Sequence, residues 1–315
     1  MFPAWLLAEP EMEESAHATP DATGPLHQPV LLQEVIELLQ PASGKVIVDC
    51  TVGPGGHSLG LLPRLLPDGR LIAMDQDEQA LEVARRRLVE FATQVTLVHD
   101  NFSRLPDALA RLGLERVDGI VADLGMSSLH VERAERGFSF THEGPLDMRM
   151  DQRLPTTAAS LIQRLPEYEL AHLLAVYGEE RWARRIAKRI VSVRRSQPIT
   201  TTAQLARLIA EAVPGRSRIH PATRTFQALR ITVNDELGAL DTLLASLPEC
   251  LASGGRAVLI SFHSLEDRRV KRAFRQGAAS GVYRLLTKKP MTASDDERAR
   301  NPRSRSAKLR AVERV

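Results

Sequence analysis

The 315-residue sequence contains only two cysteines, Cys50 and Cys250, too few for a disulfide framework or a cysteine-rich zinc site. Aromatic residues make up only 4% of the chain, so a broad base-stacking platform is not expected. No apolar run approaches the ~20 residues that cross a bilayer, and the histidines lack the spacing of a metal motif. These shortages favour a globular protein of the cytoplasm that uses neither a membrane nor a metal.

The formal net charge is also small, +3, but it is unevenly distributed. Residues 1–26 carry five acidic residues and no Lys or Arg, whereas residues 266–315 carry fifteen Lys and Arg against six acidic residues. The basic C-terminal end favours a polyanionic partner, with a solvated basic tail as the alternative. Residues 1–26 show no sustained periodicity, so they are predicted to form a mobile acidic leader.

The next part of the chain alternates short apolar runs with helical patterns. Strands are predicted at residues 45–50, 70–75, 95–100 and 117–124. Residues 131–217 contain helical patterns only, and strand character returns at 256–262 after a helix through 225–247. The pattern predicts an α/β fold with a Rossmann-like sheet, built by residues 27–130 and 218–315. The helical insertion, residues 131–217, is the candidate substrate-recognition domain.

Three features follow the ends of successive predicted strands and indicate a nucleotide-type cofactor. A Gly-rich turn at residues 53–56 lies before a helix, Asp75 ends the next strand, and Phe102 follows the third. In open α/β sheets all three border one crevice at the carboxyl ends of the strands. The ligand is either a dinucleotide or S-adenosylmethionine. Asp49, Asp75 and Asp123 at strand ends favour the positively charged sulfonium compound.

Nine dense polar strings occur along the rest of the chain. They are His27–Leu31, Asp123–Ser128, Arg136–Phe140, Gly144–Asp151, Tyr177–Arg181, His220–Arg230, Val233–Leu237, Ser261–Asp267 and Asn301–Arg310. Together the strings closely resemble the bacterial 16S ribosomal RNA (cytosine-N4)-methyltransferase family, the RsmH or MraW type. The resemblance extends from about residue 27 to residue 310.

The resemblance implies a Rossmann-like, S-adenosylmethionine-dependent enzyme with an inserted helical domain. The target in that family is the exocyclic N4 of one cytidine (position 1402 in the usual numbering) in the decoding region of 16S rRNA, within the small ribosomal subunit. The family's cofactor contacts correspond here to Gly55, Gly56, His57, Asp75, Phe102 and Asp123. A glutamine contact of the family is replaced by His130, in the string Ser127-Ser128-Leu129-His130.

The chemistry of such a target suggests candidate catalytic residues. The lone pair of cytosine N4 is delocalised into the ring, so an acceptor bonded to the amine hydrogens would aid attack. Asp123 is the first candidate, with Ser127 and Ser128 as orienting groups, although Asp123 could equally contact only the cofactor. His263 follows the last predicted strand and is a further candidate, with a structural histidine as the alternative.

Basic residues outside the crevice are candidates for RNA contact. They are Arg181, Arg185 and Lys188 on a predicted helix, and Arg303 and Arg305 near the C-terminal end. The alternatives are a methyltransferase of DNA or of a small molecule, a cofactor-sensing RNA-binding protein without turnover, and a NAD dehydrogenase. DNA amino-methyltransferases carry an Asp/Asn-Pro-Pro-aromatic string where this chain has Asp123-Leu124-Gly125-Met126. A homodimer is neither required nor excluded by the sequence.

Overall fold

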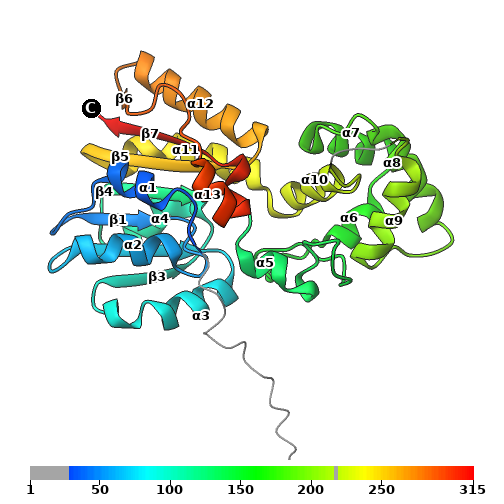
Figure 1. Ribbon diagram of the computed structural model, residues 1–315, viewed down its shortest axis with the longest axis horizontal. Helices are drawn as coiled ribbons and strands as arrows, with labels where there is room; N and C mark the ends of the chain where they lie inside the picture. Colours follow the sequence, from blue (N-terminus) through cyan, green and yellow to red (C-terminus); the bar gives the residue numbers. More distant parts are fainter. Residues whose placement is uncertain (1–27, 216–218) are drawn as a thin grey trace, which may run out of the picture.

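The structure, a computed structural model, describes residues 28–215 and 219–315; the expected leader at residues 1–26 lies outside this range. A body built on a β-sheet and a second, helical body lie side by side, with α5 (Ser128–Glu132) and α10 (Thr223–Asn234) between them (Figure 1). None of the described helices is long and apolar enough to cross a membrane.

The sheet of the first body has seven strands in the described residues, in the order β3-β2-β1-β4-β5-β7-β6. The strands are β1 (Val46–Asp49), β2 (Arg70–Asp75), β3 (Val95–His99), β4 (Val117–Asp123), β5 (Leu251–Ser261), β6 (Tyr283–Leu285) and β7 (Lys308–Arg314). Strands β1 to β5 are parallel, and β7 runs antiparallel between β5 and β6. The strand order reverses between β1 and β4, where open α/β sheets bind their ligands.

Helices cover both faces of the sheet and bury its apolar strands. One face packs against α1 (Leu32–Leu39), α2 (Gly56–Leu65) and α3 (Glu78–Arg87). The other face packs against α4 (Leu105–Arg111), α11 (Glu236–Cys250) and α12 (Ser264–Ala279). Burial on both faces explains why the parallel strands read as nearly continuous apolar runs.

The helical body has an apolar core of its own, which is separate from the cores of the sheet body. Its helices are α6 (Ala158–Arg164), α7 (Glu167–Gly178), α8 (Ala183–Arg194), α9 (Thr202–Ala212) and α10. Leu174, Ile186 and Leu229 are fully buried in this core, so α10 packs with the helical body although it lies beyond residue 217. The domain boundaries given by the sequence stay a prediction.

The single helix expected through residues 225–247 is wrong. The chain breaks into α10 and α11 at Asp235, which adopts a left-handed conformation with φ of 46°. Aspartate tolerates this conformation better than most residues. The side chain of Asn234 supports the break, because Oδ1 accepts from the Met150 N–H and Nδ2 donates to the Met148 carbonyl.

The C-terminal end is also different from the expected basic tail. Residues Lys308–Arg314 form β7 inside the sheet, and Arg310 is buried, with its Nε donating to Asp267 at 2.7 Å. Residues 308–314 are therefore part of the sheet, and the alternative of a solvated basic tail does not hold for them. Strand β6, which closes this edge of the sheet, was not predicted from the sequence either.

Candidate active site

A cleft of about 330 Å³ opens at the carboxyl ends of β1, β2 and β4. Its volume lies within the range of small-ligand sites, which are about 300 to 1,000 Å³. Residues of the Gly-rich turn, Asp75, Phe102 and Asp123 line one end of the cleft, and residues of α10, α11 and the start of α12 line the other. We call these the cofactor end and the target end. The cleft therefore lies where the sheet body meets the helical body.

The Gly-rich turn after β1 reaches the cleft through Gly53, Pro54 and Gly56, whereas Gly55 is not among the lining residues. Gly53 and Gly55 have φ values of +51° and +86°, which favour glycine. Gly55 precedes α2, whose first N–H groups have no partner within the helix. A Cβ on Gly56 would lie only 3.2 Å from the Pro29 ring. The turn therefore brings backbone donors close to the cleft.

Asp75 holds the Gly-rich turn against the end of β2. Its Oδ2 accepts from the Gly53 N–H at 2.8 Å, and its Oδ1 accepts from the Asp77 N–H at 2.9 Å. Burial raises the pKa of Asp75 to about 6, more than the two N–H groups lower it. Each carboxylate oxygen retains a second lone pair, so Asp75 can also accept from a hydroxyl group in the cleft.

Asp123 ends β4 and is the least satisfied carboxylate of the cleft. Its Oδ1 is buried and has no hydrogen-bond partner in the described structure, and its Oδ2 lies 3.9 Å from Nδ1 of His57. The His57 Nε2 donates to the Val30 carbonyl at 2.9 Å, which fixes the orientation of the ring beside Asp123. Burial raises the pKa of Asp123 to about 6, and the neighbouring Asp49 and Glu266 act in the same direction.

The donor set at the cofactor end fits a sulfonium compound. Asp75 and Asp123 line this end, whereas Asp49, at the end of β1, is buried and accepts from the Ser58 hydroxyl. None of the three forms an ion pair with Lys or Arg within residues 28–215 and 219–315. A positive ligand would supply the missing counter-charge and relieve the cost of burying these carboxylates. A pyrophosphate would add negative charge to the same place.

The family model described as the MraW methylase family matches residues 25–315 of the chain. The chain belongs to this family. It is therefore a methyltransferase, and its methyl donor is S-adenosyl-L-methionine, as the sequence predicts.

Two curated relatives illustrate the extent of the similarity. Both are named ribosomal RNA small subunit methyltransferase H. The protein from Geobacter sulfurreducens is 51% identical over 307 residues, which cover 92% of this chain and 99% of that relative. The protein from Geobacter sp. (strain M21) is 49% identical over 308 residues, covering 92% of this chain and 98% of the relative.

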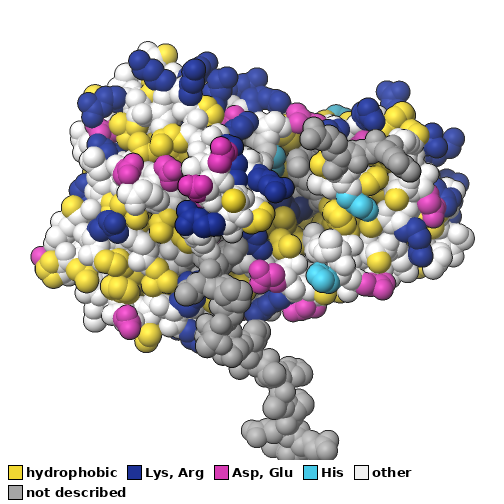
Figure 2. Space-filling model, viewed as in Figure 1, with side chains coloured by type: hydrophobic (Ala, Val, Ile, Leu, Met, Phe, Trp, Pro, Cys, Tyr) yellow, Lys and Arg dark blue, Asp and Glu magenta, His cyan; other side chains and the backbone are white. Residues whose placement is uncertain are grey.

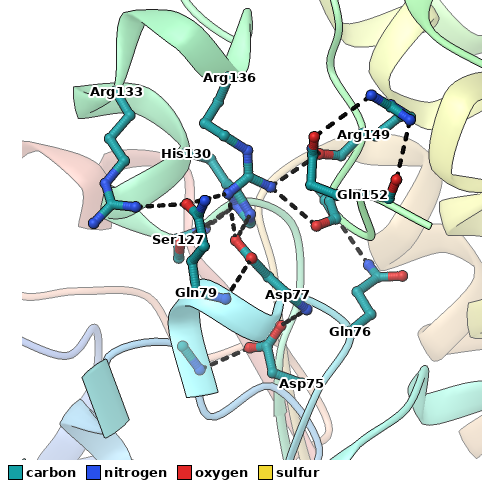
Figure 3. A network of polar contacts seen from close by, with 12 residues as sticks. Asp75, Gln76, Asp77, Gln79, Ser127, His130, Arg133, Arg136, Arg149 and Gln152 are labelled. Carbon is teal, nitrogen blue, oxygen red and sulfur yellow. Dashed lines mark hydrogen bonds and ion pairs between the residues drawn. The ribbon is translucent and has the colours of Figure 1, made fainter. Parts of the chain in front are cut away.

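A buried polar network supports the cofactor end of this methylase (Figure 3). Asp77 caps α3, and its Oδ2 accepts from His130 Nε2 at 2.9 Å and from Arg136 Nη1 at 2.8 Å. The second terminal nitrogen of the Arg136 guanidinium, Nη2, donates to the carbonyls of Arg149 and Met150. The network thus joins β2 and α3 to the segment that leads into the helical body.

The network determines what His130 can do. Its Nε2 is bonded to Asp77, and its Nδ1 accepts from the Ser127 N–H at 3.2 Å. Since both ring nitrogens are occupied, this arrangement leaves neither for a ligand, although the ring lies in the cleft wall beside Phe138. A direct bond from His130 to the cofactor stays a prediction. Ser127 and Ser128 begin α5 beside it, and Ser128 is buried.

At the target end, four charged or titratable side chains come together. Arg230 donates to Glu236 through Nε and Nη2 at 2.7 and 2.9 Å, and His263 Nε2 lies 3.1 Å from Oε1 of Glu266. Burial alone would raise the pKa of Glu266, but the hydrogen bond of His263 and the charge of Arg230 lower it. His263 also caps α12, where its Nδ1 faces the Glu266 N–H.

Arg230, Glu236 and Glu266 were not predicted from the sequence as site residues, and the side chain of Arg230 is only 12% exposed. The signal was present in the three polar strings that contain them. Ligand atoms of Glu236, His263 and Glu266 lie within 4.8 Å of one another, a spacing that suits a metal ion. The guanidinium of Arg230 on Glu236 opposes a cation there, so we assign none.

The residues expected to contact RNA lie outside the cleft or at its edge. Arg181, Arg185 and Lys188 are exposed at and along α8 in the helical body. Arg303 lines the cleft within the 3-10 helix at Pro302–Ser306, whereas Arg305 is exposed. Figure 2 shows further Lys and Arg side chains gathered over α12 and around α8. The cleft thus brings together six of the seven predicted cofactor contacts, all except Gly55, and the basic residues are spread over both bodies.

Proposed function

We propose that this methylase transfers a methyl group to the exocyclic N4 of one cytidine, position 1402, in the decoding region of 16S rRNA. The printed names of the relatives, which specify a methyltransferase of small-subunit ribosomal RNA, support the substrate class. The observation that carries the atom specificity is the buried, unpartnered Oδ1 of Asp123 in the cleft. This oxygen is an acceptor suited to an amino group.

The residues present divide the work between the two ends of the cleft. When bound, S-adenosyl-L-methionine supplies an electrophilic methyl group. Asp75 would accept a hydroxyl of its ribose, and the Gly-rich turn would lie along its amino-acid portion. Phe102 lines the same end and offers an apolar face to the adenine. Each of these assignments is a proposal for the residue named.

Asp123 would act on the nucleophile. A hydrogen bond from the cytosine amine to Oδ1 localises the N4 lone pair, which forms the new N–C bond as the C–S bond breaks. The proton lost from N4 passes to Asp123 and then to solvent. A pKa of about 6 leaves the carboxylate ionised at neutral pH and close enough to that pH to release the proton. Ser127 and Ser128 orient the loop that follows.

His263 has a positioning part in this scheme. Its Nδ1 faces the Glu266 N–H and its Nε2 lies 3.1 Å from Oε1 of Glu266, so His263 would hold the start of α12 at the cleft. Arg303 lies at the edge of the cleft, where a phosphate of the extruded nucleotide could approach it.

The basic surfaces would provide most of the affinity for RNA. On α12 the acidic Glu266 and Asp267 face inward and pair within the protein, while Arg268, Arg272 and Arg275 are exposed. Arg181, Arg185 and Lys188 are exposed on the helical body, so both bodies carry basic surfaces outside the cleft. Electrostatic contact to phosphates is independent of sequence and weakens with salt. One base extruded into the cleft would then supply the specificity.

The test uses small ribosomal subunits that lack the modification. The protein is incubated with these subunits and a labelled methyl donor, and the product is mapped by nuclease digestion and mass spectrometry. We expect label on N4 of a single cytidine of 16S rRNA. Label on another nucleoside, on DNA or on protein would overturn the proposal. A parallel reaction with naked 16S rRNA would show whether the assembled subunit in the cytoplasm is the substrate, and sedimentation would test for a homodimer.

A further inference from the structure

Arg230 is a mostly buried arginine at the target end of the cleft. Its side chain is 12% exposed, and both Nε and Nη2 are bonded to Glu236, which fixes the plane of the guanidinium. The third nitrogen, Nη1, has no hydrogen bond in the described part of the chain, and Arg230 lines the cleft. The cleft thus contains one oriented donor at its target end.

This donor lies in the same neighbourhood as the acceptor Asp123. Glu266 interacts electrostatically with both Arg230 and Asp123. Its charge raises the pKa of Asp123, and the charge of Arg230 lowers the pKa of Glu266. Arg230 comes from α10, and Asp123 comes from the end of β4. The two side chains therefore present an acceptor and a donor from the helical body and the sheet body to one space.

The edge of cytosine that carries N4 has the matching pattern. Its amine N4–H is a donor and the adjacent ring nitrogen N3 is an acceptor, whereas uracil presents an acceptor at O4 and a donor at N3. We propose that Arg230 is a specificity-determining residue, whose Nη1 donates to N3 of the target cytosine while Asp123 accepts from N4. This proposal rests on the proposed function.

The surroundings of Arg230 favour a base over a phosphate. Glu236 and Glu266 lie beside the guanidinium, and Asp123 shares the cleft, so a negative phosphate would meet three carboxylates. A neutral base avoids this repulsion and needs only one directed donor. Pairing with Glu236 also holds the guanidinium still, which lowers the entropy lost on binding the base.

The experiment is a cycle between enzyme and substrate. The target cytidine of 16S rRNA is replaced by 3-deazacytidine through splint ligation, and the RNA is assembled into small subunits. 3-Deazacytidine keeps the amine but has carbon in place of N3. The wild-type protein is compared with Arg230→Gln/Glu236→Gln, a double variant that removes the ion pair without leaving either charge buried alone. Arg70→Gln, an exposed position at the opposite end of β2, is the control.

For each protein we define the penalty as the factor by which kcat/KM falls from the natural to the 3-deaza substrate. We expect this penalty to be about 10- to 100-fold larger for the wild type than for the double variant, because only the wild type loses a hydrogen bond from a charged donor. Any intrinsic change in N4 reactivity affects both proteins and cancels. Cofactor binding by calorimetry and thermal unfolding check that the double variant is folded.

Three outcomes decide the matter. A 3-deaza penalty confined to the wild type and Arg70→Gln supports the assignment. An equal penalty in all three proteins overturns it. The double variant could also be less active than the wild type by the same factor on both substrates, with an activity that depends less on salt concentration. This result would identify a phosphate contact and would also overturn the assignment. If the wild type fails to methylate the natural cytidine at all, the proposed function fails and not only the role of Arg230.

Discussion

The two ends of the cleft contain buried carboxylates in opposite electrostatic states. At the cofactor end, Asp75 and Asp123 have pKa values raised to about 6, because burial outweighs the weak partners available. Glu266 at the target end and Asp77 in the supporting network are at least as buried, yet their pKa values are lowered. The difference lies in the partners of the two carboxylates with lowered pKa values. Arg230 and His263 lie beside Glu266, and Arg136 and His130 lie beside Asp77.

This contrast separates structural carboxylates from those prepared for a ligand. A carboxylate with its own cation is satisfied before anything binds, and it holds elements together. A buried carboxylate without one remains costly until a positive group or a proton donor arrives. In this methylase the unsatisfied group is Asp123, the carboxylate that we propose accepts from the target amine.

The largest effect is expected from Asp123→Asn, which keeps the shape of the side chain but abolishes proton acceptance. Loss of a general base typically lowers turnover about 10²- to 10⁴-fold, whereas cofactor affinity should change much less. Single-turnover kinetics and calorimetry measure the two separately. If Asp123→Asn and Asp75→Ala weakened cofactor binding equally and turnover remained, Asp123 would be a cofactor contact only.

Removing the partner of the paired carboxylate Asp77 should lower the stability of the fold. Arg136→Ala leaves the Asp77 charge buried without its guanidinium partner, and breaking a buried pair costs about 3 to 5 kcal/mol. Urea unfolding measures the free energy of unfolding. Arg133→Ala is the matched control, because Arg133 also bonds Gln79 but is partly exposed, and it should cost less than about 1 kcal/mol. Equal losses in both variants would contradict the importance of the buried pair.

Much of this arrangement can be predicted from sequence, for physical reasons. Strands at residues 70–75 and 117–123 are buried on both faces, so they appear as apolar runs, and Asp75 and Asp123 are placed by ending those runs. In β7, charged residues alternate with apolar ones, which reads as a basic tail. Arg230 and Glu266 come from segments that meet only through tertiary packing, so no local period indicates their proximity.

Asp75→Ala should reduce cofactor affinity by about 10- to 100-fold, as expected for loss of hydrogen bonds to a charged acceptor. The Gly-rich turn would also lose the acceptor of the Gly53 N–H. Calorimetry with S-adenosylmethionine and with its demethylated product measures the change. Asp68→Ala, at an exposed position in the turn before β2, should bind as the wild type does. Unchanged affinity in Asp75→Ala would remove this residue from the cofactor site.

The smallest effect concerns the pH dependence of stability in the ligand-free protein. The pKa of Asp123 is about 6 in the folded protein and 3.8 in ordinary surroundings, so its stabilising contribution is complete below pH 3.8 and is lost as pH rises through about 6. Asp123→Asn removes this loss. The change in the free energy of unfolding caused by Asp123→Asn should therefore be more favourable at pH 7.5 than at pH 4.5, by about 1 to 2 kcal/mol. This figure is smaller than the full two-unit pKa shift would give, because the Asp123 side chain is partly exposed.

Chemical unfolding of both ligand-free proteins at the two pH values measures this difference. A stability difference that is the same at both pH values would mean that Asp123 is already satisfied in the ligand-free protein. The contrast between the two ends of the cleft would then no longer identify the catalytic carboxylate.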